Sequence, residues 1–128
     1  MKLLFDTHTF IWWDSQPNQL SQTALALLQD RSSILLLSVV SIWEMQIKLQ
    51  VGKLTLNRAL VEIIESQKKI NQIEVLPVKQ DHVLALDSLP LIHKDPFDRL
   101  LVAQANVENA ALVSGDPIVA QYSVNIIW

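Results

Sequence analysis

Five short apolar runs constrain the fold of this chain more than any other feature of its sequence. They show little alternation of polar and apolar residues, and they cover Lys2–Phe5, Ile34–Leu37, Glu74–Val78, Ala111–Val113 and Val124–Ile127. Strands covered on both faces by helices have such continuous apolar sequences because neither face is exposed to water. The runs therefore predict an interior sheet that is mainly parallel.

The segments between these runs are long enough to form helices. We expect helices over Ser21–Gln29, Ser38–Gln50, Asn57–Ile70, Gln80–Ser88 and Pro96–Asn109. Pro96 suits a first helical position, with Asp95 as the N-cap. Strands that alternate with helices in this way predict an α/β fold, a three-layer α/β/α sandwich around a sheet of about five strands. The 128 residues fit a single domain spanning residues 1–128.

Composition excludes several kinds of chemistry. The chain has no cysteine, so disulfides, thiolate catalysis and Cys-ligated zinc are excluded. Two glycines are too few for a phosphate-binding P-loop or a dinucleotide-binding turn, and no serine lies in a G-x-S-x-G elbow. Ten Lys and Arg against 13 Asp and Glu give a formal net charge of -3, which argues against a basic coat for nucleic acid.

Neither a secretory signal nor a membrane span is expected. Only three apolar residues precede Asp6 after Lys2, whereas a signal peptide has an apolar region of about 7–15 residues. The longest apolar stretch, Ile34 to Trp43, is about half the roughly 20 residues that a membrane span needs. We expect a cytoplasmic protein with no membrane partner.

Two acids follow predicted strands. Asp6 comes directly after the first apolar run, and Asp116 follows the run that ends at Val113. Ligands of open α/β sheets bind at the edge formed by the carboxyl ends of the strands, so these acids are candidates for a site. Each could equally be a turn or N-cap residue.

Two further acids lie near the starts of predicted helices. Glu44 falls within an apolar stripe, but it could also close a capping box with Ser41 or pair with Lys48 four residues on. Asp98 falls in the first turn after Pro96, where it could simply favour the positive end of the helix. Taken singly, neither acid decides between a structural and a functional role.

Taken together, the four acids predict a metal site at one edge of the sandwich. Close carboxylates raise each other's pKa and cannot all stay ionised without compensation. No basic residue is obviously placed to pair with them. A divalent cation would compensate the charge, and oxygen ligands without cysteine or a histidine motif favour Mg²⁺ or Mn²⁺, one or two ions. Such a site suggests phosphodiester hydrolysis.

Several segments carry a family resemblance that runs over essentially the whole chain. They are Leu4-Phe5-Asp6-Thr7-His8, Ser41–Lys48, Gly52-Lys53-Leu54, Asp95–Ala105, Ser114-Gly115-Asp116, Tyr122 and Ile127-Trp128. In this order the sequence resembles PIN domains of the VapC toxin type. The chain departs from the family pattern at Gly115, where a bulkier residue is expected before the acid.

The resemblance implies a PIN-like sandwich that acts as a Mg²⁺- or Mn²⁺-dependent endoribonuclease, the toxin of a type II toxin–antitoxin pair. Its acidic quartet would be Asp6, Glu44, Asp98 and Asp116. Asp6 and Asp98 would bind metal directly, and Glu44 and Asp116 directly or through water, with Thr7 and Ser114 supporting them. RNA would be the substrate, and an antitoxin protein the partner. We also expect a homodimer, because the chain is small and has many apolar helix faces.

Other residues have both a functional and a structural interpretation. Among His8, His82 and His93, His8 is the best candidate for contact with metal or substrate because it lies next to Asp6. Trp12, Trp13 and Trp43 could stack on bases, although core packing or a protein interface is the more common role of tryptophan. The basic residues Lys48, Arg99, Lys53 and Lys94 could contact RNA phosphates or form a solvated rim.

Two other functions compete with the nuclease. One is a Mg²⁺-dependent phosphatase or phosphoacceptor that uses Asp6, although Asp6-Thr7-His8 lacks the second Asp that such phosphatases carry. The other is a non-catalytic interaction module whose acids only cap helices. Phosphate transfer to Asp6 would support the first, and failure to bind Mg²⁺ would support the second.

Overall fold

A computed structural model describes residues 1–128 and contains a five-stranded sheet between two layers of helices. The strands are β1 (Lys2–Phe5), β2 (Ile34–Ser38), β3 (Glu74–Leu76), β4 (Ala111–Val113) and β5 (Ile126–Ile127). Their order is β3-β2-β1-β4-β5, and every neighbouring pair is parallel. The α/β/α prediction with about five parallel strands is confirmed.

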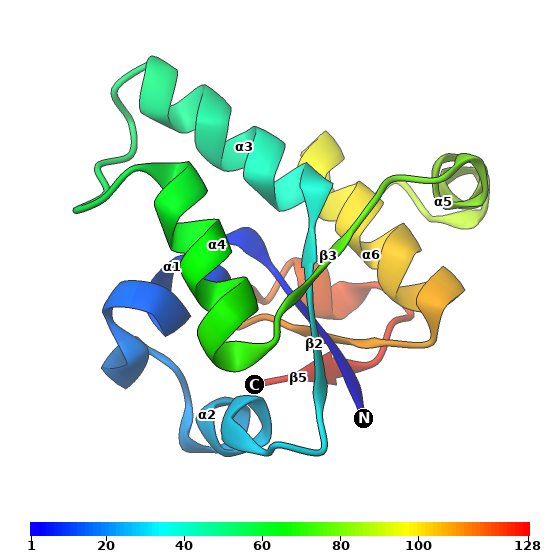
Figure 1. The fold of residues 1–128 in the computed structure, drawn as a ribbon. Helices are drawn as coiled ribbons and strands as arrows, with labels where there is room; N and C mark the ends of the chain where they lie inside the picture. Colours follow the sequence, from blue (N-terminus) through cyan, green and yellow to red (C-terminus); the bar gives the residue numbers. More distant parts are fainter.

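Six α-helices surround this sheet (Figure 1). They are α1 (Thr7–Ser15), α2 (Gln22–Gln29), α3 (Val39–Gln50), α4 (Leu60–Asn71), α5 (Gln80–Leu84) and α6 (Pro96–Glu108), with 3₁₀ turns at Pro17–Gln19, Ala85–Ser88 and Val119–Gln121. In Figure 1, α1, α2 and α4 lie on one side of the sheet and α5 and α6 on the other. No helix has the length and apolar character needed to cross a membrane.

The alternation of side chains along the strands explains why the apolar runs have no polar face. In β1, Leu3 and Phe5 belong to a cluster that includes Met45 of α3 and Ile63 of α4. Leu4 points the other way, into a second cluster formed with helix α6. Leu3, Leu4 and Phe5 are therefore all buried, although they face opposite sides of the sheet.

Helix α1 is the one α-helix that the sequence pattern did not predict. Its sequence THTFIWWDS is rich in Thr, Ile and Trp, which are weak helix formers. Packing and capping compensate: Phe10 is buried, and the Asp6 carboxylate accepts a hydrogen bond from the Thr9 backbone N–H at 2.7 Å. The tertiary structure thus stabilises a helix that local propensity does not favour.

Smaller differences concern the ends of elements. Strand β3 ends at Leu76 rather than Val78, since Pro77 cannot donate to the sheet. Strand β5 is limited to Ile126–Ile127, and α4 begins at Leu60 rather than Asn57. The helix predicted over Gln80–Ser88 changes to 3₁₀ geometry after Leu84.

Candidate metal and active site

The four predicted acids line one pocket at the carboxyl edge of the sheet. Strands β1 and β4 are neighbours, and the Asp6 backbone N–H donates to the Val113 carbonyl at 3.1 Å, so the residues that follow these strands lie together. The pocket has a volume of about 430 Å³. It is lined by Asp6, Thr7, His8, Trp12, Glu44, Lys48, His93, Asp95, Asp98, Gly115, Asp116 and Trp128.

Asp6 is buried at the start of α1 and has two roles available to it. Its carboxylate caps α1 through the Thr9 N–H, and it lines the pocket. Burial raises the pKa of Asp6, although Thr9 and Ser114 lower it. The N-cap interpretation is therefore correct, but a cap exposed to solvent would not carry this electrostatic cost.

Asp98 lies in the first turn of α6 and faces the same pocket. Asp95 is the N-cap, as predicted, and accepts from the backbone N–H groups of Phe97 and Asp98 at 2.9 and 3.3 Å. The pKa of Asp98 is raised to about 6, first by burial, then by the charge of Asp95 and, more weakly, by those of Glu44 and Asp6. A hydrogen bond with His93 at 3.1 Å opposes this rise without cancelling it.

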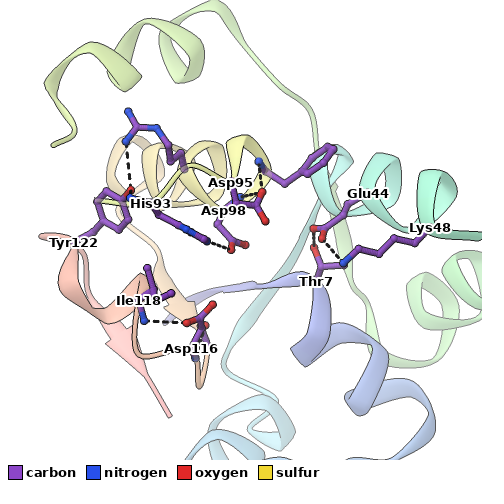
Figure 2. A network of polar contacts seen from close by, with 12 residues as sticks. Thr7, Glu44, Lys48, His93, Asp95, Asp98, Asp116, Ile118 and Tyr122 are labelled. Carbon is purple, nitrogen blue, oxygen red and sulfur yellow. Dashed lines mark hydrogen bonds and ion pairs between the residues drawn. The ribbon is translucent and has the colours of Figure 1, made fainter. Parts of the chain in front are cut away.

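Glu44 is held from two sides (Figure 2). The Thr7 hydroxyl donates to Oε1 of Glu44 at 2.7 Å, and the Lys48 Nζ lies 2.7 Å from Oε2. The expectation that no basic residue is placed to pair with the acids is therefore wrong for Glu44. The capping box with Ser41 is also wrong, because α3 begins at Val39 with Ser38 as its N-cap.

Asp116 lies on the loop after β4 and is half-buried, as Asp98 is, whereas Asp6 and Glu44 are buried. Its carboxylate accepts from the Ile118 N–H at 2.9 Å, and its own N–H donates to the Ser114 hydroxyl at 3.2 Å. Gly115 precedes it for a steric reason: a Cβ there would lie 2.6 Å from Cε2 of Trp128. The departure from the family pattern at Gly115 is thus matched by a close approach of Trp128.

His93 is the histidine that joins the acids, whereas the sequence favoured His8. One ligand atom each from His93, Asp98 and Asp116 lies within 4.8 Å of the others, and Asp6 and Glu44 lie outside this set. The His93 N–H donates to the Tyr122 hydroxyl at 2.9 Å, which fixes the backbone of its loop. No ligand spacing in the sequence marks His93, so its sequence position gave no signal.

The other two histidines differ in environment. His8 is exposed and lines the pocket beside Trp12. His82 is fully buried, where Nδ1 accepts from the Lys79 N–H at 3.0 Å and Nε2 lies 2.8 Å from Glu108. His82 therefore connects α5 to α6 and lies outside the pocket.

The basic residues proposed to contact RNA also separate into two groups. Lys48 lines the pocket, whereas the Arg99 guanidinium donates to the Pro90 carbonyl at 2.8 Å and to the Tyr122 hydroxyl at 3.3 Å. Lys53 and Lys94 do not line the pocket. Of the four, only Lys48 is placed to meet a group bound beside the acids.

The donor set fits a divalent cation. Carboxylates from four segments of the chain and the His93 imidazole face a single pocket, and burial raises the pKa of both Asp6 and Asp98. Lys48 neutralises Glu44 alone. Oxygen donors suit Mg²⁺ and Mn²⁺, and the additional imidazole makes Mn²⁺ at least as suitable.

A parallel α/β/α sandwich with an acidic pocket at its carboxyl edge is a fold and site typical of metal-dependent enzymes that act on phosphate esters. The PIN domain family model matches residues 3–125, and the chain belongs to the PIN domain family.

Solved structures show the same fold at low sequence identity. A VapBC2 structure from Rickettsia felis, bound to a DNA fragment from its promoter, aligns with a TM-score of 0.73 and 14% identity over 99% of this chain and 98% of that one. A domain of a functionally unknown protein from Methanocaldococcus jannaschii aligns with a TM-score of 0.57 and 13% identity, covering 99% and 89%. No curated protein matches the sequence significantly.

Proposed function

We propose that this protein is a Mg²⁺- or Mn²⁺-dependent endoribonuclease and the toxin of a type II toxin–antitoxin pair. The observation that carries the proposal is the set of four acids lining one pocket, two of them with raised pKa values that a cation would lower. Membership of the PIN domain family, whose members are generally nucleases, supports the reaction class.

In this proposal Asp6 and Asp98 bind the metal directly, and Glu44 and Asp116 bind it directly or through water. His93 is added to this set because it shares a cluster with Asp98 and Asp116. When bound, the cation would stabilise the developing charge on the scissile phosphate and make water a better nucleophile. Whether one or two ions bind depends on how many of these groups take part.

The remaining polar residues orient the acids. Thr7 donates to one oxygen of Glu44, and Lys48 forms an ion pair with the other, so both oxygens of this buried carboxylate have partners. The Ser114 hydroxyl accepts from the Asp116 backbone N–H, and the Ser114 side chain lowers the pKa of Asp6. The Lys48 ammonium lies in the pocket, where it can also approach a phosphate oxygen of the substrate.

The test is cleavage of single-stranded RNA with Mg²⁺ or Mn²⁺. We expect cleavage that EDTA abolishes and that Asp6→Asn reduces at least 100-fold, as for removal of a group that acts in the transition state (about 2.7 kcal/mol or more). Asp87→Asn, an exposed acid outside the pocket, is the matched control and should leave the rate unchanged. Cleavage that survives both EDTA and Asp6→Asn would contradict the proposal.

Two further experiments separate the competing functions. A non-catalytic module predicts no Mg²⁺ binding in calorimetry, whereas the nuclease predicts binding that Asp98→Asn removes. A phosphoacceptor predicts covalent labelling of Asp6 by acetyl phosphate. Nothing in the pocket favours that reaction, since one oxygen of Asp6 already caps α1.

The antitoxin is the proposed protein partner, and the similarity of fold to a VapBC2 structure supports it. Large apolar side chains are exposed on the segment around α5 and the following loop, among them Leu84 (63% exposed) and Leu91 (92% exposed). Such side chains are suited to a protein interface. Co-expression with the product of the neighbouring gene, followed by size-exclusion chromatography, should give a complex with suppressed nuclease activity. Size-exclusion chromatography of the protein alone tests the proposed homodimer.

A further inference from the structure

An aromatic wall flanks the acidic pocket on one side. We use this name for the rings of His8, Trp12 and Trp128, which all line the pocket. The ring centroids of His8 and Trp12 are 5.9 Å apart, and those of Trp12 and Trp128 are 6.1 Å apart, with interplanar angles of 43° and 48°. Trp128 keeps 38% of its surface exposed, so its ring is available to a ligand.

The position of Trp128 follows from Gly115. The indole approaches the loop so closely that a Cβ on residue 115 would lie 2.6 Å from Cε2 and 2.9 Å from Cζ2. Any side chain at 115 would displace the ring. Because Asp116 is the next residue, this contact places an aromatic surface directly beside an acid of the candidate metal site.

The other tryptophans are arranged differently. Trp13 donates its indole N–H to Gln67 at 3.0 Å and packs against Phe5 in the core. Trp43 is 58% exposed and packs edge-on against Phe97, but it does not line the pocket. Only Trp12 and Trp128 combine an aromatic face with proximity to the acids.

We propose that the aromatic wall is a subsite for one nucleobase of single-stranded RNA, next to the phosphate held at the acids. The proposal rests on the endoribonuclease function above. A nucleotide whose phosphate lies at the acids has its base within the same pocket, and an aromatic ring accepts any base by stacking on its π face. Bases in a duplex are not free to stack in this way, so the subsite selects for unpaired RNA.

The first test compares Trp128→Ala, Trp128→Phe and the control Trp43→Ala on a short RNA and on the same RNA lacking the base beside the scissile phosphate. We expect Trp128→Ala to lower kcat/KM roughly 10-fold, mainly through KM, while Trp128→Phe and Trp43→Ala stay within about twofold of the wild type. Removing the base should slow the wild type by a similar factor and should not slow Trp128→Ala further. Thermal unfolding of each variant verifies that it is folded.

The proposal would be overturned if removal of the base lowered kcat/KM equally in the wild type and in Trp128→Ala. An unchanged kcat/KM of Trp128→Ala on the intact RNA would overturn it as well. So would a Trp128→Ala variant that cuts RNA normally but no longer binds the antitoxin, since the wall would then be a protein contact.

A second test does not depend on cleavage. Adenosine is uncharged, so the acids do not repel it, and it can be titrated in EDTA. We expect the indole N–H resonance of Trp128, assigned by its loss in Trp128→Phe, to shift while that of Trp43 does not. If the wild type cuts no RNA but this shift occurs, the proposed function fails and the base subsite stands. If RNA is cut and neither resonance shifts, the base subsite is refuted and the proposed nuclease function stands.

Discussion

Neutralising Asp98 should stabilise the metal-free protein. In Asp98→Asn the side chain keeps its shape but cannot carry the charge that burial and the neighbouring acids oppose. The same change should abolish cleavage, because it removes a proposed metal ligand. Stability and activity are thus expected to move in opposite directions at this position.

The magnitude follows from the pKa. A rise from 3.8 to about 6 corresponds to about 3 kcal/mol that opposes ionisation in the folded protein, at about 1.36 kcal/mol for each pH unit. About a fifth of the Asp98 side chain, 19%, is exposed, so solvent screens part of this energy. We therefore expect a gain of about 1.5 kcal/mol at pH 8, which corresponds to a rise in Tm of about 4–8 °C.

The pH dependence has a definite sign. The pKa of Asp98 is raised in the folded state, so the folded protein retains this proton up to about pH 6 while the unfolded chain releases it near 3.8. The stability that the proton contributes is complete below pH 3.8 and is lost as the pH rises through 6. The advantage of Asp98→Asn should therefore be small at pH 4 and reach its full value above pH 7.

Urea unfolding in EDTA at pH 4, 5, 6, 7 and 8 measures this difference, with Asp87→Asn as the control for a generic loss of one charge. Adding Mg²⁺ at about 100 times its Kd should then stabilise the wild type by about 2.7 kcal/mol and leave Asp98→Asn unchanged. The reasoning would be refuted if Asp98→Asn were no more stable than the wild type at pH 8 in EDTA. An advantage of equal size at pH 4 and pH 8 would refute it as well.

Four substitutions at three further positions test other contacts. Asp6→Asn should keep the cap on α1 and stay folded while losing cleavage, whereas Asp6→Ala should lose about 1 kcal/mol more stability in urea unfolding because its cap is gone. Gly115→Ala should destabilise the protein by about 1–3 kcal/mol, measured by the same method, because its Cβ displaces Trp128. Thr7→Val should cost about 1–2 kcal/mol at pH 8, since it removes the hydroxyl that donates to buried Glu44. The corresponding contact would be contradicted if Asp6→Ala were as stable as Asp6→Asn, or if Gly115→Ala or Thr7→Val were as stable as the wild type.

The sheet could be predicted because its signal is strong and local. Strand β1 contributes Leu3 and Phe5 to one core cluster and Leu4 to the other, so three consecutive residues must all be apolar. Helix α1 could not be predicted in the same way. Its stability comes from the burial of Phe10 and the cap from Asp6, neither of which is visible in the periodicity of its residues.

Some residues of the candidate site could likewise be predicted from the sequence, and others could not. Asp6 and Asp116 follow strands and could be predicted from topology. Trp128 directly follows β5, so the rule that placed the two acids at this edge also places Trp128 there, and applying it to aromatic residues would have found it. His93 lies in a loop with no such register, and only the folded structure brings it to Asp98.

The capping and the metal-binding interpretations of the acids are compatible, and the pKa values show how. A carboxylate that only caps a helix is stabilised in its ionised form by backbone N–H groups, so its pKa falls. Asp6 caps α1 and yet has a raised pKa, as does Asp98. Folding therefore buries these carboxylates, and brings Asp98 near other acids, at a cost in free energy that the two apolar clusters on either side of the sheet offset. A bound cation would relieve that cost. The residues that destabilise the metal-free protein are therefore the ones expected to stabilise the metal-bound protein.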